Sequence, residues 1–231
     1  MNEIETQKKI DEISEQFNSL GIFSDDSSVR EQGIAALKQE FQEDARKFLN
    51  RMKKTNLLLT VVMSDLQRVS MESRNNFDDQ FRRRTAIRAF AAAVDGSVFC
   101  LKELTHAAAG LKKIQLNEEE DKFLLDEKID GKHHLGFKEN FKRTFQLFAQ
   151  IMNFPYATNF DRHEFSALCE TFKLRHQLMH PKSFLTFCVT DDQAKQAGEA
   201  AEWLHNEIQK LFDSCNKKIN SNIEKELKRS N

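Results

Sequence analysis

Glycine and proline are scarce in this sequence. It has 7 glycines and 2 prolines among 231 residues, where average usage would give about 28 of the two together. Turns between strands depend heavily on these two residues, so the scarcity excludes a β-sandwich, a β-barrel and a doubly wound α/β fold. The composition instead favours long amphipathic helices joined by short connections, and it offers no glycine-rich loop for a nucleotide cofactor.

Other features are also missing. The longest apolar run, Leu57–Met63, is interrupted by Thr60 and is far shorter than the roughly 20 residues of a membrane span. The acidic start, Met1–Glu5, excludes a signal peptide, and the four cysteines form no CxxC pair. We therefore expect a cytoplasmic protein with no membrane contact. Because 35 Lys and Arg face 36 Asp and Glu, only a local patch could attract nucleic acid.

Apolar residues recur at helical spacing along most of the chain. The pattern predicts helices over residues 3–20, 29–71 (as one helix or two), 82–105, 118–125, 137–152, 160–180 and 194–219. The segment Ser183–Val189 is short, apolar and β-like. We expect an all-α, up-and-down bundle of about five to seven helices with a core made mostly of Phe and Leu. Residues 1–75 form an N-terminal helical extension that packs on the bundle or stands outside it, and 76–231 form the bundle itself.

Two expected helix starts carry capping-box patterns. Thr158 with Asp161 precedes one helix, and Thr190 with Gln193 precedes the last. Pro181 stops the helix between them, because a residue before proline avoids the α conformation.

The residues with the best chemistry lie at that proline stop. Arg175, His176 and His180 come directly before Pro181. The planar guanidinium of arginine suits a phosphate, and histidine suits proton transfer near neutral pH. Residues five apart lie about 140° around a helix axis, so Arg175 and His180 flank one phosphate only if His180 leaves helical geometry. The alternative is a solvated arginine and a histidine that caps the helix C-terminus.

The pattern resembles the motif of the HEPN superfamily, in which an Arg is followed by Asn, Asp or His and then, after a few residues, by His. Arg175, His176 and His180 match it, and the resemblance covers roughly residues 78–220. The helix from Arg82 is similar to an early family helix that packs against the motif helix and lends an acidic residue, here Asp95. A HEPN-like bundle is the fold that the resemblance implies.

The resemblance also implies a reaction and partners. It implies metal-independent cleavage of single-stranded RNA by 2′-OH attack at a homodimeric site, with no cofactor. Arg175 would stabilise the phosphorane, His180 would act as general acid or base, and His176 would orient the backbone. Such enzymes act as toxins or defence factors with an antitoxin or another protein partner. Other family members bind only a nucleotide or a protein, and some carry a modified tyrosine where this chain has Lys182.

Two further patterns have functional alternatives. The arginines Arg82, Arg83, Arg84 and Arg88 could guide an RNA backbone toward the motif, or they could form a solvated basic helix start. His176 and His180 stand at i and i+4, with Cys169 on nearly the same stripe, which is zinc-ligand spacing. No glutamate follows His176 as a base, and Cys169 is more simply a small core residue. We therefore expect no metal site.

Overall fold

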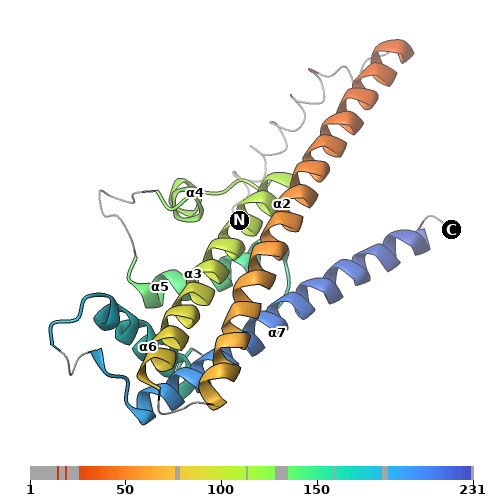
Figure 1. Cartoon of the computed structure of the whole chain (residues 1–231). Coiled ribbons are helices and arrows are strands. Elements are labelled where there is room, and N and C mark those ends of the chain that lie inside the picture. The colour runs from red at the N-terminus through yellow and green to blue at the C-terminus, as the bar shows by residue number, and fades with distance from the viewer. Residues whose placement is uncertain are drawn as a thin grey trace. The chain divides into compact units, whose positions relative to one another are not determined.

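The computed structural model describes residues 15, 19, 26–75, 79–112, 114–127, 135–158, 160–183 and 187–229. These residues form helices and loops without a strand, which confirms the all-α class. The helices are α2 (Ser27–Asn75), α3 (Gln80–Leu111), α4 (Glu118–Leu124), α5 (Phe137–Met152), α6 (His163–Met179) and α7 (Asp191–Arg229), as Figure 1 shows. The expected helix over 3–20 lies outside the described residues, apart from Glu15 and Ser19. In the β-like segment, residues 187–189 form no strand.

The chain divides into two compact units, residues 1–50 and 51–231. In the first unit the described part of α2 begins after Asp26. The carboxylate of Asp26 accepts a hydrogen bond from the backbone N–H of Ser28 at 2.8 Å, which satisfies one of the unpaired donors of the first turn. The boundary expected after residue 75 coincides with the end of α2, whereas the two units divide inside this helix.

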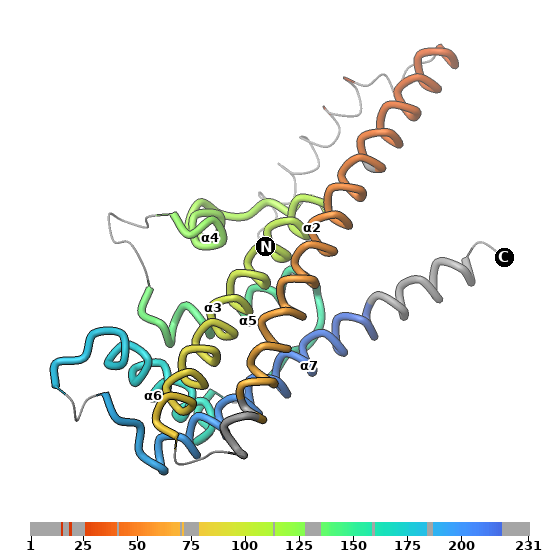
Figure 2. Tube along the Cα trace, in the orientation of Figure 1, coloured from red at the N-terminus to blue at the C-terminus, as the bar shows by residue number. Residues whose placement is uncertain are grey.

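The second unit is built around α3. This helix packs against α4, α5, α6 and α7, and α6 and α7 also pack against each other; the tube in Figure 2 traces the same elements. The core is aromatic, and the rings of Phe141, Phe145, Phe165 and Trp203 are all buried. Phe rings leave no polar group to satisfy, so this part of the core needs no hydrogen-bond partners for them.

The second half of α2 contributes to this core. Leu59 and Leu66 are buried in the same cluster as the α3 residues. A Cβ atom at Gly96 of α3 would lie 3.3 Å from a methyl of Val62, so the missing side chain lets the two helices approach closely. Arg51 and Glu103 form an ion pair at 3.3 Å between the same two helices.

The N-termini of α6 and α7 are capped differently. At α7 the expected capping box is present, because the N–H of Gln193 donates to the Thr190 hydroxyl and the N–H of Thr190 donates to the Gln193 side chain. At α6 the expected box is wrong. The helix begins after Arg162, without a side-chain cap, and the Thr158 hydroxyl instead donates to buried Glu207 of α7 at 2.6 Å.

The two prolines lie just beyond helix ends. α5 ends at Met152, and the left-handed backbone of its C-cap Asn153 (φ 58°) closes the helix two residues before Pro155. α6 ends at Met179, and its C-cap His180 lies directly before Pro181. Across the described residues, none of the helices has an apolar stretch that could cross a membrane.

Candidate functional site

The C-terminal end of α6 has one buried side and one exposed side. Leu174 and Leu178 point inward and pack with Ile87 of α3 and with Val189 and Ala197 around the start of α7. These contacts fix the axis of the helix. The other side presents Arg175, His176, Met179 and His180 to solvent, with Arg175 half-buried. A rigid backbone therefore carries polar side chains that the core does not use.

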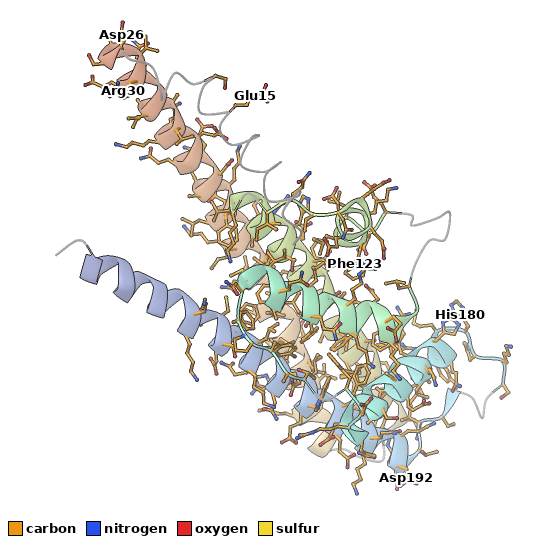
Figure 3. All side chains as sticks on the ribbon, turned by 180° about the vertical axis from the view of Figure 1, so that it is seen from behind. Glu15, Asp26, Arg30, Phe123, His180 and Asp192 are labelled. Carbon is orange, nitrogen blue, oxygen red and sulfur yellow. The ribbon has the colours of Figure 1, made fainter. Side chains whose placement is uncertain are left out.

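The two histidines lie next to each other. The ring centroids of His176 and His180 are 5.1 Å apart, and the rings are tilted by 58°. His180 is the C-cap residue with φ −130° and ψ 63°, and its backbone N–H still donates to the carbonyl of His176. His180 has thus left helical geometry, as the position before Pro181 predicts. Figure 3 shows it at the outer end of α6.

Arg175 is supported by aromatic rings. Its guanidinium carbon lies 5.9 Å from the ring centroid of Phe172, and that ring stacks on Phe137 of α5 at 3.9 Å. A ring face attracts the cation weakly and leaves the N–H donors at its edge available. Within the described residues, Arg175 makes no hydrogen bond or ion pair that would use these donors.

Asp95 of α3 is the acidic residue that the sequence analysis assigns to the site. Partial burial raises the pKa of its carboxylate, and the positive charge of Arg175 acts in the opposite direction. The two side chains are therefore within electrostatic reach of each other across the α3–α6 contact. The role of Asp95 beside Arg175 stays a prediction.

The arginine run separates into two groups. Arg82 pairs with Asp79 at 3.3 Å, and Arg83 is buried, where it donates to the carbonyl of Val189 and pairs with Asp191. Arg83 therefore links α3 to the start of α7 rather than facing a ligand. Arg84 lies over the ring of Phe187 at 4.2 Å. Arg88 is half-buried, and its Nε atom is covered without a hydrogen-bond partner among the described residues.

The zinc alternative finds no support in the geometry. Among the described residues there is no group of three or more His, Cys, Asp or Glu side chains that could hold a metal ion. Cys169 packs at the edge of the aromatic core, and burial raises the pKa of its thiol, as for a small core residue.

Two exposed aromatic side chains of α3 were not predicted from the sequence. Phe81 and Phe99 of α3 are 65% and 50% exposed, on the same side of the helix as Arg84 and Arg88. The sequence feature that could have identified them is a large apolar residue at a position that the helical repeat assigns to the polar face.

Comparison with known proteins gives no relative. No family model, no curated protein and no solved structure matches this chain. The functional argument therefore depends on the residues at the end of α6 and along α3.

Proposed function

We propose that this chain is a metal-independent endoribonuclease of the HEPN type, which cuts single-stranded RNA at a site formed by two copies of the α6 end. The observation that carries the proposal is the group of half-buried Arg175 and exposed His176 and His180, on a helix end that buries Leu174 and Leu178. One cation and two proton carriers beside each other are the groups that RNA cleavage without a metal requires.

The reaction would follow from these groups. One His180 takes the proton from a ribose 2′-OH, whose oxygen attacks the adjacent phosphorus. The bond from phosphorus to the 5′-oxygen breaks, and that oxygen takes a proton from the His180 of a second copy. Arg175 stabilises the charge on the phosphorane, and His176 positions the backbone. The products are a 2′,3′-cyclic phosphate and a 5′-hydroxyl, with no water consumed in this step.

The test compares the two ends of α6. Arg175→Ala and His180→Ala should each lower cleavage of a labelled single-stranded RNA by at least about 100-fold in EDTA, which is the range for loss of an acid–base or charge-stabilising group. Arg162→Ala and His163→Ala replace the same residue types at the exposed opposite end and should keep full activity. A substrate with 2′-deoxyribose at the cut should resist.

The alternative is a non-catalytic module that binds a nucleotide or a partner protein with the same residues. Equal cleavage by the wild type and all four variants would reject the α6 end as the active site, and no cleavage by the wild type would reject the nuclease. Binding of RNA or a nucleotide that is lost in Arg175→Ala, without any cleavage, would favour the module. Circular dichroism of each variant shows whether the bundle remains folded.

A further inference from the structure

The exposed face of α3 combines aromatic and cationic side chains. Counting along the helix in steps of three and four residues places Phe81, Arg84, Arg88, Ala92, Asp95 and Phe99 on one face. We call these six residues the α3 strip. From Phe81 to Phe99 the rise of the helix gives about 27 Å. Both phenylalanines are at least half exposed, although Phe usually belongs in the core.

Two arginines of the α3 strip form no ion pair with a carboxylate among the described residues. Arg84 rests on the ring of Phe187, and Arg88 has a covered Nε atom without a hydrogen-bond partner among the described residues. In that part of the chain, neither side chain forms an ion pair. A half-buried guanidinium without an anion is costly, so a phosphate that meets the terminal nitrogens of Arg88 would offset part of this cost. The covered Nε atom itself is not accessible to such a ligand.

The neighbours of the α3 strip define its limits. On the α2 side, the ion pair of Arg51 with Glu103 marks one edge. Leu58 follows Arg51 by seven residues on α2, and Phe99 precedes Glu103 by four residues on α3. Each therefore lies on the same helix face as its member of this ion pair. Leu58 is 40% exposed. The edge beside Phe99 is therefore apolar and open to solvent.

The charges give the α3 strip a direction. Beyond Phe99, α4 docks on α3 through His106 and Asp121 at 3.2 Å, and its first turn carries Glu118, Glu119, Glu120 and Asp121. This acidic turn repels a phosphate chain. On the other flank, Arg175 lies within electrostatic reach of Asp95 and offsets its charge. The charges thus favour a polyanion along Arg84 and Arg88, with Arg175 on the flank. The acidic turn of α4 disfavours its continuation beyond Phe99.

We propose that the α3 strip binds single-stranded RNA, with phosphates on Arg84 and Arg88 and with a base stacked on the ring of Phe99. This inference rests on the proposed function, because it names the surface that holds the substrate beside Arg175. Aromatic rings interleaved with arginines are the usual combination for single strands, since every base offers a flat face to stack. An apolar docking face for protein would not need the two arginines.

The experiment uses the full chain and a 2′-O-methyl RNA that cannot be cut. Phe99→Leu keeps the apolar surface but removes the flat ring, and it should weaken binding at least about 5-fold by fluorescence anisotropy. Phe99→Tyr keeps the ring and should bind like the wild type. Leu125→Ala replaces an apolar residue with similar exposure at the end of α4 and serves as the control.

A second measurement reports contact directly. Trp203 is the sole tryptophan and is buried, so Phe99→Trp places a new fluorophore on the surface. Its emission should be quenched when RNA binds, whereas a tryptophan introduced by Leu125→Trp at the end of α4 should not respond. Arg88→Ala should weaken binding and reduce the salt dependence of the affinity by about one phosphate contact.

The outcomes separate this inference from the nuclease. If Phe99→Leu loses RNA binding but the wild type cuts no RNA, the α3 strip stands and the nuclease fails. If cleavage depends on Arg175 while Phe99→Leu and Phe99→Trp show no change in binding or emission, the α3 strip is wrong. A switch of Phe99→Leu from dimer to monomer with unchanged RNA affinity would also overturn it, because the face would then hold a second copy.

Discussion

The two ends of α6 use the same helix differently. Near its start, Phe165 is 1% exposed and touches the rings of Phe141, Phe160 and Trp203 at 5.0 to 5.7 Å between centroids. Near its end, Leu178 is equally buried, but its neighbour Met179 is 48% exposed. The first end is part of the aromatic core, whereas the second end buries only one side, through Leu174 and Leu178. Chemistry is therefore compatible with the exposed side of the second end, where a side chain such as Met179 can change without loss of core packing.

The largest expected effect tests this difference in packing. Phe165→Ala should lower the free energy of unfolding by about 3–5 kcal/mol, the usual cost of truncating a buried Phe. Met179→Ala, fourteen residues later on the same helix, should stay within about 0.5 kcal/mol of the wild type. Urea unfolding followed by far-UV circular dichroism measures both. Similar losses in the two variants would mean that the ends of α6 do not differ in packing.

A smaller effect should come from Glu207, which anchors the segment that leads into α6. Its buried carboxylate accepts hydrogen bonds from Thr158 at 2.6 Å, from Lys210 at 2.8 Å and from Tyr156 at 3.2 Å. Burial alone would raise the pKa of Glu207, but the hydrogen bonds from these three donors outweigh it and hold the pKa below its ordinary value. Glu207→Gln would place an amide N–H among donors, so we expect a loss of about 2 kcal/mol at pH 7.

The pH dependence of this loss has a definite sign. Because the pKa of Glu207 is lower in the folded state, its stabilisation is complete above the ordinary glutamate value of about 4.3 and disappears as the pH falls through the folded value. The gap between the wild type and Glu207→Gln should therefore narrow below about pH 4. Glu202→Gln, at an exposed position of α7, should show no such gap at any pH, and a gap that widens in acid would contradict the assignment.

Much of the fold follows from local patterns in the sequence. The helical repeats placed α3 to α7, and the capping box of Thr190 and Gln193 marked the start of α7, because these signals act within a few residues. The box at Thr158 failed because its hydroxyl found a partner, Glu207, 49 residues away. No local pattern contains such a partner.

The candidate site shows the same division. The closeness of His176 and His180 follows from their i, i+4 spacing. The different environments of Arg82, Arg83, Arg84 and Arg88 do not follow from the sequence, because four arginines near a helix start look alike there. Arg83 is buried because Val189 and Asp191 arrive beside it from the far end of the chain. Arg84 and Arg88 stay on the surface side because α3 turns them away from that contact.

The smallest expected effect concerns Asp95 of α3, which interacts electrostatically with Arg175 near the exposed end of α6. Burial raises the pKa of its carboxylate against the opposing charge of Arg175, so the ionised form is disfavoured by the fold. Its stabilisation is complete below the ordinary aspartate value of about 3.9 and is lost as the pH rises through the folded value. Asp95→Asn should thus be more stable than the wild type by a few tenths of a kcal/mol at pH 7, with a smaller gain at pH 4. Thermal unfolding at the two pH values measures this, and a variant that is less stable at pH 7 would show that attraction to Arg175 outweighs burial. If RNA cleavage falls in the same variant while its stability rises, Asp95 acts by positioning Arg175 and not by supporting the bundle.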